Sequence, residues 1–169
     1  MKDFNESSYE KANRIILKKF GHPSSINRYL NDLENGLWDS ERILFEDFIP
    51  YGNKVLDIGC GIGRVSGNLS EKYKFVGLDL SPDMINVAKD LFPQQEFHVG
   101  DAREMEFPDA SFDAAVFLYN GFSEIYGDSN RLQVLNEIGR ILVPEGIFIL
   151  SSPKRRLKDI PRLIRSFID

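Results

Sequence analysis

The sequence has little of the residue chemistry that disulfide frameworks and metal centres require. Its 169 residues include one cysteine, Cys60, and two histidines, His22 and His98. A single cysteine can form no internal disulfide, and it cannot build a zinc site alone. We therefore expect no metal site and a reducing, cytoplasmic setting.

Long apolar runs are also missing. No stretch approaches the roughly 20 apolar residues of a membrane-spanning helix. Lys2, Asp3, Asn5 and Glu6 interrupt the start, where a signal peptide would be basic and then apolar. Hydrophobic residues make up 42% and charged residues 28%, which is ordinary for a globular protein. We expect one domain over residues 1–169 and no membrane partner.

The net charge of −5 is unevenly distributed. Residues 154–169 hold six basic residues against two acidic ones, so the remainder is strongly acidic. One interpretation is a tail that binds a polyanion. The interpretation we favour is a basic amphipathic helix over residues 153–169, because apolar residues recur there at helical spacing: Leu157, Ile160, Ile164 and Phe167.

The most informative stretch is residues 54–64. A short apolar run with strand character is followed by three glycines in five residues, Gly59, Gly61 and Gly63, and then by a helical pattern. The glycines thus lie between the carboxyl end of a strand and the amino end of a helix. In α/β folds that crevice binds nucleotide-like ligands, because free N–H groups and the positive end of the helix dipole meet there.

Two spacings narrow this interpretation. The order G-x-G-x-G differs from the dinucleotide fingerprint G-x-G-x-x-G, which counts against a pyrophosphate ligand. A second apolar strand over residues 75–79 ends in Asp79, twenty residues after Gly59. At that separation an acid can accept hydrogen bonds from ribose hydroxyls.

With these motifs the chain resembles the class I S-adenosylmethionine-dependent methyltransferases over roughly residues 37–152. The first family motif, D/E-x-G-x-G-x-G, is matched by residues 57–63, the second-strand acid by Asp79, and the third-strand turn by Gly100-Asp101-Ala102. The resemblance implies S-adenosylmethionine as cofactor and a Rossmann-like, doubly wound α/β fold. The family's mostly parallel sheet has the strand order 3-2-1-4-5-7-6, with strand 7 antiparallel.

The rest of the pattern agrees with this fold. Strands and helices alternate, which favours a parallel sheet with right-handed crossovers. Residues 1–50 would form a helical cap and residues 51–152 the cofactor-binding core. Helices are expected over 6–20, from a cap at Ser25, over 39–49 and 64–73, from Ser81-Pro82 to Pro93, and from a cap at Asp128-Ser129. Strands are expected over 54–58, 75–79, 97–99, 112–118 and 147–151.

The clearest departure from the family lies at the end of the chain. The sequence stops one helix after the fifth strand, so strands 6 and 7 are expected to be absent. The apolar run 147–150 would then lie on an unpaired sheet edge. Either the sequence is a fragment, which we favour, or another chain covers that edge in an oligomer.

By resemblance, the cofactor-binding residues are Asp57, Gly59, Cys60, Gly61, Gly63, Asp79, Leu80, Met84, Asp101, Ala102 and Leu118. Asp79 would take the ribose hydroxyls and Asp101 the adenine amino group, while Asp57 would order the loop or reach the cofactor's amino group through water. Local roles stay open for each: Asp57 could satisfy loop N–H groups, Asp79 could cap a helix, and Asp101 could form a turn. Cys60 is expected to be a small buried residue rather than a nucleophile.

The acceptor side is less specific. Tyr119, Asn120 and Glu124 follow the fourth strand and could orient or deprotonate an acceptor, or merely form a loop. Tyr29, Trp38 and Arg42 could line a pocket, although Trp38 fits simple packing better.

The acceptor expected by elimination is a small molecule. The segment after the fourth strand lacks the Asn-Pro-Pro-aromatic tetrad of the amino-methylating nucleic-acid enzymes, and Cys60 leaves no further thiol for attack on a pyrimidine. We do not expect a nucleic-acid acceptor. The alternatives are an RNA or protein methyltransferase that uses the basic tail, and a catalytically inert cofactor-binding partner subunit.

Overall fold

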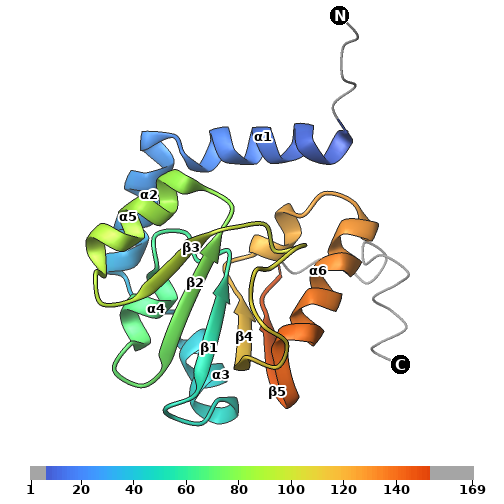
Figure 1. Ribbon diagram of the computed structural model, residues 1–169. Coiled ribbons are helices and arrows are strands. Elements are labelled where there is room, and N and C mark those ends of the chain that lie inside the picture. The colour runs from blue at the N-terminus through green and yellow to red at the C-terminus, as the bar shows by residue number, and fades with distance from the viewer. Residues whose placement is uncertain (1–6, 153–169) are drawn as a thin grey trace, which may run out of the picture.

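The structure is a computed structural model that describes residues 7–152. Its centre is a five-stranded parallel sheet with the order β3-β2-β1-β4-β5 (Figure 1). This confirms the predicted fold class and the order of the first five strands. The strands are β1 Lys54–Ile58, β2 Lys74–Asp79, β3 Glu96–Val99, β4 Phe112–Phe117 and β5 Leu142–Leu150.

Helices cover both faces of the sheet and its carboxyl end. In chain order they are α1 Ser8–Phe20, α2 Pro23–Glu34, α3 Asp39–Phe48, α4 Arg64–Leu69, α5 Pro82–Leu91, the 3₁₀ helix η1 Gly121–Glu124, and α6 Asp128–Ile141. In Figure 1, α1 lies across the top of the molecule, above the carboxyl ends of β1 and β2.

Successive side chains of β1 point to opposite faces of the sheet, so this strand contributes residues to two separate hydrophobic clusters. Leu56 and Ile58 belong to a buried cluster with Val134, Ile138 and Ile141 of α6. The other face of the sheet has a separate cluster, which joins β1 to α3 and α4 through Val55, Phe45, Val65 and Leu69. Because both faces of the sheet are covered, the sequences of the central strands β1, β2 and β4 are mostly apolar along their length.

The predicted starts of α2 and α6 were wrong. The N-cap of α2 precedes a proline, and the N-cap of α6 is a glycine. Ser25 lies inside α2, whereas His22 is the N-cap and its ring nitrogen Nδ1 accepts from the Ser24 N–H at 3.2 Å. Pro23 occupies the first helical position, which suits its fixed φ and missing N–H. Asp128 is the first residue of α6 rather than its cap, and Gly127 precedes it at φ 83°.

Other predicted boundaries also shifted. Helix α4 ends at Leu69, not at residue 73, and β4 ends at Phe117. Strand β5 begins at Leu142, five residues before the predicted start, because Phe112 pairs with Leu142 before the register shifts. The intervening Pro-Glu-Gly segment, which precedes the predicted strand, lies within β5 where the register shifts, with Glu145 at φ 66°.

Within residues 7–152, β5 pairs with β4 alone and forms one edge of the sheet. The predicted tail helix lies outside the described residues. None of the described helices has the length and apolar character to cross a bilayer.

Candidate functional site

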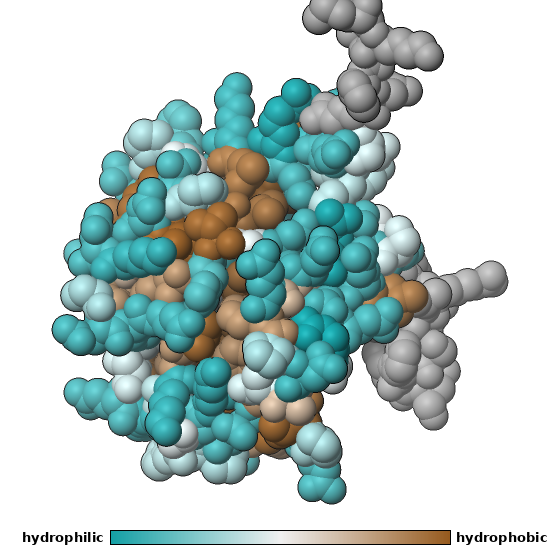
Figure 2. All heavy atoms as spheres, viewed as in Figure 1, coloured by the Kyte–Doolittle hydropathy of each residue, from teal (hydrophilic) through white to brown (hydrophobic). Residues whose placement is uncertain are grey.

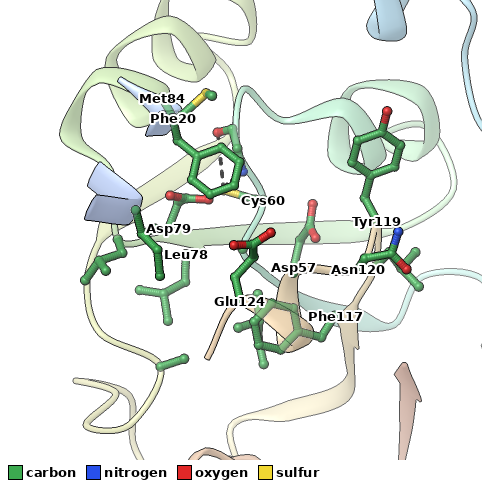
Figure 3. A pocket seen from close by; sticks show the side chains of 18 of the residues that line it. Phe20, Asp57, Cys60, Leu78, Asp79, Met84, Phe117, Tyr119, Asn120 and Glu124 are labelled. Atoms are coloured by element: carbon green, nitrogen blue, oxygen red, sulfur yellow. Dashed lines mark hydrogen bonds between the residues drawn. The ribbon is translucent and has the colours of Figure 1, made fainter. Parts of the chain in front are cut away.

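A cavity of about 350 Å³ opens at the carboxyl ends of β1, β2 and β4, beneath α1 and α2 (Figure 3). This volume lies in the range of small-molecule sites. The position is the crevice where parallel α/β sheets bind their ligands. The cavity therefore coincides with the place that the glycine motif predicted.

The floor of the cavity is the loop Asp57–Gly63, which we call the floor loop. Gly59 has φ 65°, and a Cβ built there would lie 2.7 Å from a ring carbon of Phe117. Gly61 has φ 55°, and its added Cβ would meet no atom within 4 Å, because it would point into open space. The first position thus needs glycine for close packing and a positive φ, whereas the second presents a bare backbone to the cavity.

Asp79 ties the floor loop to the end of β2. Its Oδ2 accepts from the Gly61 N–H and its Oδ1 from the Ser81 N–H, each at 2.8 Å. Burial raises the pKa of Asp79, and these two hydrogen bonds oppose the rise. A carboxylate has about four acceptor sites. Asp79 can therefore hold the loop and still accept hydrogen bonds from a ligand in the cavity that it lines.

Asp57 is buried beside the cavity, with 2% of its surface exposed, and its Oδ2 has no hydrogen-bond partner. That oxygen does not satisfy the N–H groups of the loop, which was one of the two predicted roles. Burial raises the pKa of Asp57 to about 8, against the opposing effect of Arg64, and the nearby Asp79 adds to the rise. An unpartnered acid of this kind is suited to a positively charged or N–H-bearing ligand.

A buried ion pair that the sequence did not reveal supports the floor loop from α3. The Arg64 guanidinium donates to both carboxylate oxygens of Glu41, at 2.7 and 2.9 Å, and to the Gly36 carbonyl oxygen at 3.2 Å. The exposed fractions are 5% for Arg64 and 3% for Glu41. The ring of Tyr119 lies 4.8 Å from the guanidinium carbon. Arg64 thereby links the first turn of α4 to α3 and to the ring of Tyr119, which lines the cavity.

The carboxylate of Asp101, at the turn after β3, accepts hydrogen bonds from two other side chains of the protein, those of Tyr9 and Arg103. The Tyr9 hydroxyl of α1 donates to both its carboxylate oxygens, at 3.1 and 3.2 Å. Arg103 adds its backbone N–H and two side-chain nitrogens, Nε and Nη2, to the same carboxylate. The predicted turn-forming role is therefore present, because Asp101 accepts from the N–H two residues later.

The three acceptor-side candidates all line the cavity, but they differ in chemistry. The Tyr119 hydroxyl donates to Asp32 at 2.6 Å, and this bond, with burial, raises the pKa of Tyr119 to about 12. The hydroxyl points away from Asp57 and Glu124 (Figure 3). Asn120 is held at φ 65°, and Glu124 forms an ion pair with Lys19 at 2.9 Å. Of the three, Glu124 is the one that carries a carboxyl group.

The structure brings together most of the residues that were predicted from the resemblance. All of the predicted cofactor residues line the cavity except Gly63, which is buried and forms the N-cap of α4. Cys60 is buried as expected, and burial raises the pKa of its thiol. Of the predicted cover residues, Tyr29 lines the cavity, whereas Trp38 and Arg42 are exposed and do not.

The sequence analysis expected a helical cap over residues 1–50 but named no residue of α1 as part of the site. One face of this helix lines the cavity with residues at 4-3-4 spacing: Tyr9, Asn13, Ile16 and Phe20. The apolar period of the helix, which includes Ile16 and Phe20, was the signal for this face. Within residues 7–152, no group of three histidine, cysteine or acidic side chains is placed to hold a metal ion.

Fold and site together define a class of protein, and comparison with known families agrees. Residues 55–146 match a family model described as a methyltransferase domain, which covers more than half of the chain. The chain belongs to this family. The predicted resemblance is therefore confirmed.

Individual relatives narrow the comparison. The chain is 35% identical to a fatty-acid O-methyltransferase of Mycolicibacterium smegmatis over 70% of its own length and 43% of the relative's. It is 33% identical to a 2-methyl-6-phytyl-1,4-hydroquinone methyltransferase of Synechocystis, over 65% of the chain and 35% of the relative. The crystal structure of a TehB-like SAM-dependent methyltransferase from Corynebacterium glutamicum matches with 31% identity and a TM-score of 0.64, over 76% of the chain and 73% of that protein. The chain thus spans less than half the length of these two curated relatives.

Proposed function

We propose that this chain binds S-adenosylmethionine in the cavity and that the protein transfers a methyl group from it to a small-molecule acceptor. The observation that carries the proposal is the floor loop. It combines a bare backbone at Gly61, a buried carboxyl group at Asp57 with an unpartnered oxygen, and the carboxyl group of Asp79. These groups surround one cavity at the sheet's switch point.

The residues present fit this cofactor. The unpartnered oxygen of Asp57 suits the cofactor's positively charged amino group, and Asp79 keeps acceptor sites for its ribose hydroxyls. Met84 and Leu80 also line the cavity and offer apolar contact to a purine. When bound, the cofactor supplies a methyl group on a sulfonium, which is already activated for displacement.

Because the donor is activated, the protein's contribution is to position the two reactants and to exclude water. Helices α1 and α2 cover the cavity and provide its upper wall. Tyr119 is held by Asp32 and keeps its proton at neutral pH, so we assign it an orienting role. If the acceptor must lose a proton within the site, Glu124 is the candidate among the three residues, once its ion pair with Lys19 opens.

We further propose that the acceptor has an apolar body. The cavity wall includes the apolar and aromatic side chains of Ile16 and Phe20 of α1, Tyr29 of α2 and Ile125 after η1. Figure 2 shows hydrophobic side chains gathered beneath α1, between polar rims. The two curated relatives described above carry names that specify a fatty acid and a phytyl hydroquinone, which agrees with an apolar acceptor.

Calorimetry and thermal unfolding with S-adenosylhomocysteine test the cofactor assignment. The ligand should bind and raise the melting temperature, because it binds only the folded chain. Asp79→Ala should abolish most of this shift, and Asp79→Asn, which keeps one acceptor oxygen for the backbone N–H groups, should retain the fold but lose affinity. Asp90→Ala, at an exposed position of α5, is the matched control and should leave the shift unchanged. Absence of any shift in the unsubstituted protein would contradict the assignment.

A further inference from the structure

The carboxylate of Asp101 has no acceptor capacity left in this structure. Four donor groups reach it: the Tyr9 hydroxyl, and the backbone N–H, Nε and Nη2 of Arg103, at distances between 2.9 and 3.3 Å. A carboxylate offers about four lone-pair sites. Asp79, with two backbone donors, lies in the same cavity and is not saturated.

The four donors differ in how they are attached. Those of Arg103 are local, because this residue lies two positions along the chain from Asp101. Tyr9 comes from 92 positions away, on α1. The Arg103 guanidinium carbon lies 3.3 Å from the centre of the Tyr9 ring, which adds a cation–π contact to the same arrangement. Tyr9 is therefore the donor that can leave without disrupting the turn.

The helix that carries Tyr9 is weakly attached to the rest of the described chain. Helix α1 has no buried residue, and its inward face lies over the cavity, where the ring of Phe20 contacts the ring of Tyr29. At its other end Lys19 forms an ion pair with Glu124, but both side chains are about half exposed, at 49% and 43%. Exposed pairs of this kind contribute little to stability.

We propose that Tyr9 occupies the position of a ligand N–H group on Asp101, and that cofactor binding exchanges the Tyr9 hydroxyl for the amino group of the purine. The inference rests on the proposed cofactor site. The exchange replaces one hydrogen bond by another, so it subtracts from cofactor affinity and releases the first turn of α1. Helix α1 then responds to whether the cofactor site is filled, and it opens the acceptor side when the donor is present.

Tyr9→Phe tests the exchange, because it removes the hydroxyl and keeps the ring beside Arg103. In the ligand-free protein, amide hydrogen exchange over residues 8–20 should accelerate in this variant. Its affinity for S-adenosylhomocysteine should rise roughly three- to tenfold, because the competing hydrogen bond is gone. In the unsubstituted protein the ligand should accelerate exchange in the first turn of α1, and in Tyr9→Phe it should add little.

Two controls separate competition at Asp101 from general loosening of α1. Lys19→Gln removes the ion pair with Glu124 but leaves Tyr9 on Asp101, so it should accelerate amide exchange at the end of α1 and change affinity by less than about twofold. Tyr51→Phe, at an exposed tyrosine near the opposite end of the sheet, should change neither quantity. A gain in affinity from Lys19→Gln equal to that from Tyr9→Phe would overturn competition at Asp101.

The remaining outcomes are equally decisive. Equal or weaker binding in Tyr9→Phe would overturn the exchange while leaving the cofactor assignment intact, since the ligand would still bind. Unchanged amide exchange of ligand-free α1 in Tyr9→Phe would show that Tyr9 does not hold the helix. Failure of both proteins to bind S-adenosylhomocysteine would overturn the proposed function together with the exchange.

Discussion

The floor loop and α1 face each other across one cavity, yet they are built in opposite ways. The floor loop is fixed by backbone hydrogen bonds, by Asp79 and by buried side chains such as Ile62. Helix α1 buries no residue and is attached through half-exposed and exposed side chains. A ligand between the two thus meets one rigid wall and one wall that can move at low cost.

The largest expected effect comes from removing the support of the floor loop. Glu41→Ala leaves the Arg64 guanidinium buried without its carboxylate, which should cost about 3–5 kcal/mol of unfolding free energy. Glu46→Ala is the matched control, because the Glu46–Lys72 pair is 40% exposed at each partner and should cost less than about 1 kcal/mol. Urea unfolding measures both changes. Similar losses in the two variants would show that the buried pair does not stabilise the floor.

Substitution of two isoleucines that line the cavity, one in the floor loop and one in α1, compares how much each wall contributes to stability. Ile62 in the floor loop is 1% exposed, whereas Ile16 of α1 is only partly buried. Ile62→Ala should lower the unfolding free energy by about 2–5 kcal/mol, because it leaves a cavity in packed surroundings. Ile16→Ala should lower it by less than about 1 kcal/mol, because no close-packed core surrounds that side chain.

Chemical denaturation of both variants, with and without S-adenosylhomocysteine, provides the measurement. If Ile16→Ala proves as destabilising as Ile62→Ala, then α1 is an integral part of the core and the contrast between the walls is wrong.

The smallest expected effect is an increase in the unfolding free energy at high pH, whereas the preceding substitutions lower it. The pKa of Asp57 is about 8 in the folded chain and near 4 in the unfolded chain, so the folded state binds the extra proton between these values. The stability contributed by this group is complete below pH 4 and is lost as the pH rises toward 8. Asp57→Asn removes the decline and should be more stable than the unsubstituted protein by about 1–3 kcal/mol at pH 8.

Unfolding free energies measured from pH 5 to pH 8 for both proteins test this linkage. Parallel pH profiles would mean that Asp57 is ionised throughout. The same substitution should weaken S-adenosylhomocysteine binding, since it removes the unpartnered carboxylate that we assign to the ligand's amino group.

The same contrast explains which parts of the site could be predicted from the sequence and which could not. The floor loop is local: Asp57, Gly59 and Gly61 lie within five residues, and Asp79 follows at a spacing that strand–helix–strand geometry dictates. The contacts that the sequence analysis missed are distant in the chain. Tyr9 meets Asp101 across 92 positions and Glu41 meets Arg64 across 23, and neither pair belongs to a recurring local pattern.

Boundary errors have the same origin. The start of β5 depends on pairing with Phe112 on another strand, and the start of α2 depends on a proline whose preferred position at the helix start outweighs the capping preference of Ser25. Local propensity identified both of these elements, and tertiary pairing or backbone restriction set where each begins.

The turn after β4 has a consequence for how this site can diversify. Tyr119 and Asn120 are consecutive residues in the left-handed region, at φ 55° and 65°. β-Branched side chains are strongly disfavoured there, whereas glycine and asparagine are tolerated. The side chains that can line the cavity are therefore restricted by backbone shape at these two positions and are freer at the α1 and η1 positions, where a helical conformation accepts most side chains.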